Sequence, residues 1–203
     1  MAKLFYQGHG SFRIISNDGV VVYVDPYLGE GYDMPADLVL ISHEHHDHTK
    51  TELITLRPDA VILRGSALTD GIRYDGYEGK GIKVSTVPAY NKNHAREECV
   101  GFIIEVDGVK VYATGDTSKT DYMPKLKKEK IDYALYCCDG IYNMDAKQAS
   151  KCAKIVKAKV DIPYHSYPEN LYSESITSQF KSKGKVILLP SQEILLEKKQ
   201  KKK

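Results

Sequence analysis

The residues best suited to chemistry in this 203-residue chain form one short cluster of histidines and aspartates. Four of the seven histidines lie within six residues, and five of the seven residues from 43 to 49 are His or Asp. Imidazole nitrogens and carboxylate oxygens are ligands that zinc, iron and manganese accept, and such a site needs no thiolate. A chance cluster in a polar loop is the alternative, and the density of histidine makes it a poor one.

The residues before this cluster predict a buried strand that would present it. Residues 37–42 are almost continuously apolar, as in a strand covered on both faces. Ligands gather at the carboxyl ends of such strands in α/β folds. His43 and His45, two residues apart in an extended segment, point the same way and can hold one metal ion. Asp47 and His48 follow where the chain turns, and they can reach a second ion beside the first.

The cluster and its preceding strand resemble the signature of the metallo-β-lactamase superfamily. The matching motif is His43-x-His45-x-Asp47-His48. Three later positions also match that family: its next ligand histidine, the aspartate of its Gly-Asp motif and its last ligand histidine. Each follows a predicted strand, directly or across a short loop. They are His94, Asp116 and His165.

This resemblance implies two divalent metal ions, with zinc expected and manganese or iron as alternatives. In the family, one ion is held by three histidines, the other by a carboxylate and two histidines, and a second carboxylate is shared. Carried over, the first ion falls to His43, His45 and His94. The second falls to Asp47, His48 and His165, and Asp116 is shared.

The activity implied by the resemblance is hydrolysis, in which a hydroxide bridging the two ions attacks a small ester, lactone or phosphodiester. Asp47 and Asp116 are the expected catalytic residues, because Asp47 can orient the hydroxide and Asp116 can fix the separation of the ions. One alternative is a metal-dependent nuclease or phosphodiesterase acting on nucleic acid. The other is a non-catalytic metal-binding member, against which the complete ligand set argues.

Three segments resemble one branch of the superfamily, the branch that contains ascorbate-6-phosphate lactonase. They are residues 8–14, 24–27 and 142–149. Asp25, at a predicted strand end, is a candidate to hold a ligand histidine by its other ring nitrogen, with a turn aspartate as the alternative. His9 is a candidate residue near the metal site, with a packed or surface histidine as the alternative.

Polar side chains beside the ligand positions are candidates to donate hydrogen bonds to a developing oxyanion. The chain has fifteen tyrosines, so chance neighbours are common and a structural role is the favoured interpretation for any one of them. The candidates are Tyr90, Asn93, Tyr164 and Tyr167.

Charge and cysteine content limit the class of protein. Lysine and arginine number 29 against 27 acidic residues, but five of the lysines lie in the last six residues. Because the basic excess belongs to this tail, nucleic acid is not an expected partner, and a small-molecule substrate is. No apolar stretch approaches the roughly 20 residues of a membrane span, and no signal-peptide pattern is present, so no membrane association is expected. Association between copies of the chain stays open.

Four cysteines without the spacing of a secreted disulfide framework favour a cytoplasmic protein with reduced thiols. Two of them are adjacent, at a place where the resembling branch has other residues. Cys137 and Cys138 are expected to pack at a strand end, with a thiol contributed to the pocket as the alternative.

The order of apolar runs and turns predicts an α/β fold, and the resemblance implies a four-layer αββα sandwich of two mixed β-sheets flanked by helices. Residues 1–197 are expected to form one such domain, followed by a disordered lysine-rich tail at 198–203. Hairpin turns are predicted at 17–19 and 107–108. One helix is expected from the N-cap Asp145, with Gln148 in a capping-box position, to Val156, and another over 169–181. Strands are predicted at 4–7, 11–16, 20–24, 37–42, 60–63, 82–87, 100–106, 109–114, 132–136, 160–163 and 186–189.

Overall fold

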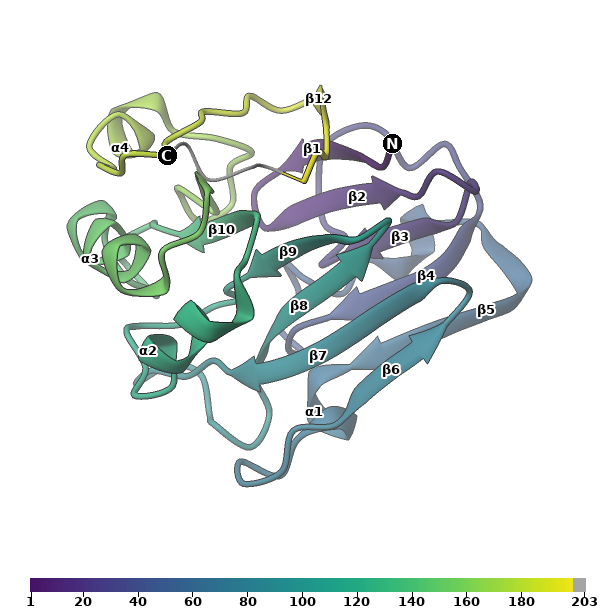
Figure 1. The fold of residues 1–203 in the computed structure, drawn as a ribbon, viewed down its shortest axis with the longest axis horizontal. Coiled ribbons are helices and arrows are strands. Elements are labelled where there is room, and N and C mark those ends of the chain that lie inside the picture. Colours follow the sequence, from purple (N-terminus) through teal and green to yellow (C-terminus); the bar gives the residue numbers. More distant parts are fainter. Residues whose placement is uncertain (199–203) are drawn as a thin grey trace.

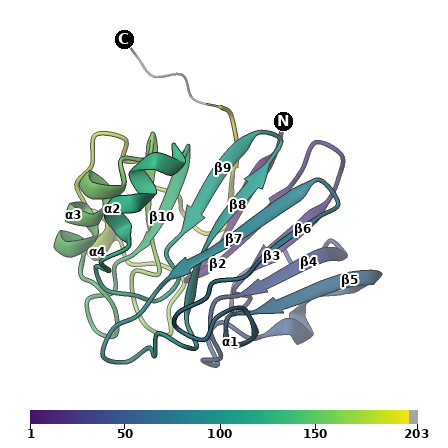
Figure 2. The same ribbon diagram turned by 60° about the horizontal axis from the view of Figure 1, so that its bottom comes forward.

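Two six-stranded mixed β-sheets frame the protein, whose computed structural model describes residues 1–198. The first sheet contains β1 (Lys3–Gly8), β2 (Ser11–Ile15), β3 (Val21–Val24), β4 (Ala36–Ile41), β5 (Leu56–Arg64) and β12 (Gln192–Leu195). The second contains β6 (Gly76–Gly79), β7 (Ile82–Pro88), β8 (Val100–Val106), β9 (Val109–Ala113), β10 (Tyr133–Cys137) and β11 (Val160–Tyr164). The strand orders are β12-β1-β2-β3-β4-β5 and β11-β10-β9-β8-β7-β6 (Figures 1 and 2). In the first sheet β3, β4 and β5 are parallel, and in the second β9, β10 and β11 are parallel.

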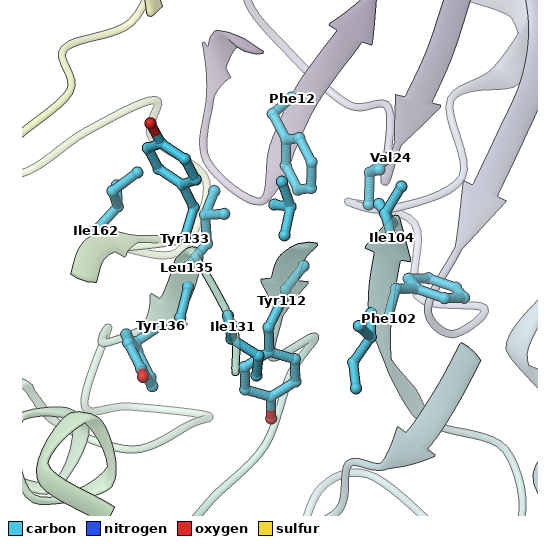
Figure 3. Close-up of a cluster of buried hydrophobic side chains, with 14 of the residues drawn as sticks. Phe12, Val24, Phe102, Ile104, Tyr112, Ile131, Tyr133, Leu135, Tyr136 and Ile162 are labelled. Carbon is cyan, nitrogen blue, oxygen red and sulfur yellow. The ribbon is translucent and has the colours of Figure 1, made fainter. Parts of the chain in front are cut away.

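The two sheets bury one apolar core between them. Phe12 and Val24 of the first sheet belong to the same buried cluster as Leu135 of the second (Figure 3). On β10 the side chains alternate, so that Tyr136 points away from Leu135 and its ring stacks on Phe180 at 5.8 Å. Every residue of β4 and of β10 is buried, which explains why their sequences are apolar runs rather than alternating patterns.

Helices are few, and most lie beside the second sheet. The longest, α3 (Ala146–Val156), packs on β10 and β11, and α2 (Met123–Leu126) and α4 (Glu174–Thr177) lie near it (Figure 1). The others are α1 (Gly65–Leu68) and the 3₁₀ turns η1 (Thr51–Leu53) and η2 (Lys127–Glu129). Among residues 1–198 no helix is long and apolar enough to cross a membrane.

The outer face of the first sheet has a small buried cluster of its own. Val21, Tyr23 and Val39 are among its members, and Tyr32 and Met34 from the loop after β3 pack against it. The fold is therefore the predicted sandwich of two mixed sheets, but its outer layer on this side consists of loops and a single 3₁₀ turn instead of long helices.

Local turn and cap chemistry predicted from the sequence is confirmed. The hairpin at 17–19 joins β2 to β3, with Gly19 at φ +81°, and both Asp107 and Gly108 have positive φ between β8 and β9. The side chain of Asp145 caps α3 by accepting a hydrogen bond from Gln148 N at 2.6 Å. The Gln148 side chain accepts from Lys119 N at 3.1 Å instead of completing the capping box.

The helix predicted over 169–181 is wrong except for the four residues of α4. Glu169 has φ +60°, which no right-handed helix contains. The carbonyl oxygen of Leu171 accepts a hydrogen bond from His9 N at 2.6 Å, so it is engaged outside its own segment. Long-range hydrogen bonding therefore overrides the helical pattern here.

The strand predicted at 186–189 is also wrong. Lys185 makes only an isolated parallel bridge to Asp161, and the last strand is β12, which pairs antiparallel with β1. The short β6 was not predicted, and β5 begins four residues before the predicted 60–63. Most of the expected lysine-rich tail, residues 199–203, lies outside the described residues.

Candidate metal centre

Loops at the carboxyl ends of neighbouring strands bring the predicted ligands together. The His-Asp cluster follows β4 in the first sheet, and the three later positions follow β7, β9 and β11 in the second. Because β9, β10 and β11 are parallel, their carboxyl ends lie at the same end of the sheet. The residues that follow these ends are Asp116, Asp139 and His165. The site thus lies where loops of both sheets converge.

The predicted ligands fall into three overlapping groups, within each of which the candidate ligand atoms lie no more than 4.8 Å apart. The first two groups contain the residues that the resemblance assigns to the first and to the second ion, with His9 added to the second group. The first group is His43, His45 and His94. The second is His9, Asp47, His48 and His165, and the third is His43, His48 and Asp116.

Asp116 lies between the first two groups. Its Oδ2 is 3.3 Å from His165 Nε2 and 3.5 Å from His94 Nε2. Its Oδ1 is 3.6 Å from His48 Nε2. One buried carboxylate therefore contacts histidines of both groups, as a shared ligand must.

Several buried polar atoms of this cluster have no hydrogen-bond partner within residues 1–198. They include His43 Nε2, His48 Nε2, His165 Nε2 and Asp116 Oδ1. Leaving such an atom unsatisfied costs about 1–3 kcal/mol, so their convergence needs an explanation. Imidazole and carboxylate lone pairs directed at a common space are the donor set of zinc, manganese or iron, so these residues fit a metal pair.

Asp25 orients two histidines of the cluster. Its Oδ2 lies 3.1 Å from His48 Nδ1. The same carboxylate accepts hydrogen bonds from Ser42 N and Ser42 Oγ, both at 2.7 Å, and Ser42 Oγ lies 3.0 Å from His43 Nδ1. This arrangement leaves Nε2 of each histidine free, which is what a carboxylate behind a metal-binding histidine provides.

Two asparagines that were not predicted from the sequence connect His94 with Asp116. His94 Nδ1 lies 2.9 Å from Asn91 Oδ1, and Asn91 Nδ2 donates to Asn143 Oδ1 at 3.1 Å. Asn143 Nδ2 donates to Asp116 Oδ2 at 2.7 Å and to Asp139 Oδ2 at 2.8 Å. Because an amide oxygen can only accept, His94 carries its proton on Nδ1 and turns the Nε2 lone pair toward Asp116.

A positional pattern could have identified Asp139. It follows β10, which lies between two strands that are themselves followed by predicted ligands. Asn143 lies in the segment 142–149 that carries the branch resemblance. No comparable pattern marks Asn91, whose partner His94 is only three residues away but across a turn.

Three residues of the centre have backbone angles that side chains rarely adopt. His9, Asp25 and His165 have φ of +53°, +46° and +44°. Such conformations cost about 1–3 kcal/mol each and persist only where surrounding contacts enforce them. His165 N donates to His9 O at 2.8 Å, so two of the three support each other.

The two main groups differ in their electrostatics. Burial lowers the pKa of His43 well below 6.5 and also lowers that of His94. Burial likewise opposes charge on His48 and His165, but Asp116 raises the pKa of His48 well above 6.5 and raises that of His165. Burial would raise the pKa of Asp116, yet the charges of His165 and His48 hold it well below 3.8. The raised pKa values of His48 and His165 and the lowered pKa of Asp116 thus arise from the attraction between these three side chains.

A cavity of about 280 Å³ opens beside the centre. Five predicted ligands line it: His45, Asp47, His94, Asp116 and His165. The other lining residues are His46, Asn93, Tyr142, Pro168 and Glu169. A larger concavity, of about 650 Å³, lies at the other end of the second sheet, beside the starts of β9, β10 and β11. No predicted ligand lines it.

The remaining candidates have different positions. Asn93 lines the cavity and donates to Tyr142 O at 2.8 Å. Tyr164 is buried in β11, and Tyr90 donates its hydroxyl hydrogen to Asp121 at 2.8 Å. Neither of these tyrosines, nor the exposed Tyr167, lines the cavity.

Cys137 and Cys138 are fully buried and belong to none of the candidate metal groups within residues 1–198. Their thiols approach the carbonyl oxygens of Thr117 and Tyr164 at 3.5 and 3.4 Å. Burial raises the pKa of Cys138 to about 12 and raises that of Cys137 well above 9. Both thiols therefore stay protonated at neutral pH, in agreement with a packing role.

Comparison with known proteins places the chain in a class. A family model described as the beta-lactamase superfamily domain matches residues 3–165, well over half of the chain. With its two mixed sheets and its His-Asp centre, the chain belongs to the metallo-β-lactamase superfamily.

Curated relatives define the family more closely. A UPF0173 metal-dependent hydrolase of Methanoregula boonei is 33% identical over 183 residues, which cover 80% of this chain and 81% of the relative. Another, of Thermococcus onnurineus, is 29% identical and covers 96% of this chain and 99% of its own length. The chain is a member of the UPF0173 family of metal-dependent hydrolases.

A solved structure agrees with this assignment. The crystal structure of a candidate metal-dependent hydrolase from Parabacteroides distasonis superposes with a TM-score of 0.77 at 28% identity. The alignment covers 93% of this chain and 92% of that one, so the similarity extends over nearly the whole fold.

Proposed function

We propose that this chain holds two divalent metal ions, zinc by preference, and hydrolyses a small ester, lactone or phosphodiester. The observation that carries the proposal is the convergence of buried, unpartnered atoms of His43, His48, His165 and Asp116 beside a cavity. Membership of a metal-dependent hydrolase family supports the reaction type.

The residues divide into two sets toward the metal pair. When bound, divalent ions supply Lewis acidity and a nucleophile derived from water at neutral pH. One ion falls to His43, His45 and His94. The other falls to Asp47, His48 and His165, and Asp116 serves both.

The two carboxylates have different tasks because they differ in access. Asp116 is buried and fixed by Asn143, so it orients the histidines around it. Asp47 is partly exposed to the cavity, and its Oδ2 lies 3.1 Å from His9 Nε2. Burial would raise the pKa of Asp47, but the His9 hydrogen bond lowers it, so Asp47 stays a carboxylate that can accept a hydrogen bond from a water molecule and orient it.

The size of the cavity supports a small substrate. A volume of about 280 Å³ lies at the lower limit of small-molecule sites and suits neither a polymer nor a large cofactor. The segments 8–14, 24–27 and 142–149 support relationship to the lactonase branch, so a cyclic ester is one of the substrate classes to test. Among residues 1–198 the cavity lining contains no lysine or arginine that would contact the backbone of a nucleic acid strand.

Elemental analysis of purified, metal-reconstituted protein tests the proposal. We expect about two equivalents of metal in the native chain, and a loss of at least one equivalent together with hydrolysis in His43→Ala. His46→Ala is the matched control, because His46 lies in the same motif but belongs to no candidate metal group. Native protein that binds no metal after reconstitution, or His43→Ala with undiminished hydrolysis, would contradict the proposal.

A further inference from the structure

We propose that the cavity beside the metal centre selects small substrates that carry a positive charge, through the carboxylate of Glu169, and discriminates against phosphorylated ones. The inference rests on the proposed hydrolytic function and adds to it the charge of the substrate. Its basis is the position of Glu169 at a cavity to whose lining residues 1–198 contribute neither lysine nor arginine.

The charges around the cavity are one-sided. In the part of the chain that the structure describes, and apart from the candidate ligands and histidine, Glu169 is the one lining residue with an acidic or basic side chain. The reacting oxygen of a substrate would face the metal centre, so the remote end of the substrate meets Glu169, Asn93 and Tyr142. Away from metal ions, proteins bind phosphate with arginine, lysine or helix N-termini, and among residues 1–198 none of these lines the cavity.

The scarcity of basic side chains here is local. Seven lysines line the larger concavity at the other end of the second sheet, beside the starts of β9, β10 and β11. The chain thus contains ample cationic side chains, and they lie away from the candidate site. A phosphorylated substrate would find no countercharge at its remote end, whereas an ammonium group would find one.

Glu169 is held in place by contacts of its neighbours. Its left-handed φ of +60° is rare for a residue other than glycine. The two carbonyl oxygens that follow it both contact His9: Asn170 O lies 3.1 Å from His9 Nδ1, and Leu171 O accepts from His9 N. The side chain of Leu171 also packs on Gly8, where an added Cβ would lie 2.8 Å from Leu171 Cδ2.

His9 also connects this segment with the metal centre. Its Nε2 lies 3.1 Å from Asp47 Oδ2, while its backbone N–H donates to Leu171 O. The backbone of Glu169 is therefore fixed relative to Asp47 before any substrate arrives, which reduces the ordering that binding requires. The ligand class that fits is a small ester or lactone with an ammonium group near the acyl carbon.

Hydrolysis of three 4-nitrophenyl esters by the metal-reconstituted full chain tests the inference. In each, the acyl C–O bond breaks, and water supplies a hydroxyl group to the acyl carbon and a proton to the departing nitrophenol. The glycinate is cationic, the acetate neutral and the hydrogen succinate anionic. We expect kcat/KM to fall in that order, with about a fivefold preference for glycinate over acetate, as one partly solvated charge pair provides.

Substitutions at Glu169 test whether its carboxylate causes the preference for the cationic ester. Glu169→Gln should bring the glycinate-to-acetate ratio close to one, and Glu169→Lys should favour the succinate. Glu174→Lys is the matched control, because Glu174 is exposed five residues along the chain and does not line the cavity. Since each ratio is taken within one protein, differences in folding or metal content cancel.

Binding without turnover separates this inference from the proposed function. Glycinamide and acetamide are titrated into the metal-loaded chain by ligand-observed NMR, and we expect glycinamide to bind several-fold tighter in the native chain but not in Glu169→Gln. If no ester is hydrolysed but this binding ratio holds, the hydrolytic function fails and the charge selection stands. If the esters are hydrolysed or the amides bound without regard to charge, or if Glu174→Lys changes the ratio as Glu169→Lys does, the inference is overturned.

Discussion

The two groups of histidines that make up the candidate metal centre differ in charge and in exposure. His43 and His94 have pKa values lowered mainly by burial, and their partner His45 faces the cavity. His48 and His165 have pKa values raised by a buried carboxylate. Burial thus disfavours charge on His43 and His94, whereas Asp116 favours protonation of His48 and His165.

With the proposed metal pair, one fold would prepare two adjacent groups of ligands in opposite ways. A metal ion entering the first group meets free lone pairs. A metal ion entering the second must displace protons that the carboxylates stabilise. The two sites should therefore respond differently to mutation and to pH.

The largest expected effect comes from removing the carboxylate that both groups contact. In metal-free Asp116→Ala the buried imidazoles of His48 and His165 lose their main countercharge, so we expect the free energy of unfolding to fall by about 3 kcal/mol. Urea denaturation of the metal-free proteins measures this. His43→Ala removes an uncharged imidazole and should cost less. Equal losses in the two variants would show that the groups do not differ in charge.

The next expected effect is on pH dependence. Because the folded pKa values of His48 and His165 are raised, these residues keep their protons to a higher pH than a free histidine does, and they must release them to bind metal. The affinity of the second site should therefore rise with pH, by about tenfold per unit for each proton released, until the pH exceeds the folded pKa. The lowered pKa values of His43 and His94 predict little change at the first site above pH 6.5. Competition with a chromophoric chelator between pH 6 and 9 measures both affinities, and two parallel pH profiles would contradict the comparison.

The smallest expected effect concerns the asparagine chain that joins the groups. Asn143→Ala removes the hydrogen bonds to Asp116 and Asp139 and breaks the connection to His94 through Asn91. We expect about a tenfold loss of metal affinity without a loss of ligands, as is typical when a hydrogen-bond partner of a ligand is removed.

A control variant and a second measurement accompany Asn143→Ala. Asn93→Ala is the control, because the Asn93 side chain donates to Tyr142 O and, within residues 1–198, makes no hydrogen bond to a candidate ligand. Nitrogen chemical shifts of His94 report the tautomer, which should lose its fixed Nδ1–H form in Asn143→Ala if the chain sets it. An unchanged tautomer and affinity would reduce the asparagines to a packing role.

Site residues were predictable from the sequence where they lie close together along the chain, and not where only the folded structure brings them together. The cluster at residues 43–48 is visible in the sequence, because its chemistry is dense and follows an apolar strand. His94, Asp116 and His165 were predicted only through resemblance, since residues so far apart meet only after both sheets have formed. Glu169 was not predicted, because its position depends on backbone hydrogen bonds to His9, some 160 residues earlier in the chain.

The fold shows the same limit. Turns and the α3 cap were predicted correctly, because they depend on side chains within a few residues of one another. The helix over 169–181 and the strand at 186–189 were wrong, because contacts with His9 and the pairing of β12 with β1 decide the structure there. The largely exposed β12 lacks the apolar pattern of an interior strand.

The left-handed backbone at His9, Asp25 and His165 has a consequence for how this chain can change. Glycine adopts such angles without steric conflict, so the backbone conformation alone would favour glycine at all three positions. Each position instead carries a buried imidazole or carboxylate that contacts the centre. A substitution that relaxed the backbone at any of the three would therefore also remove a contact of the centre, so backbone and site can change there only together.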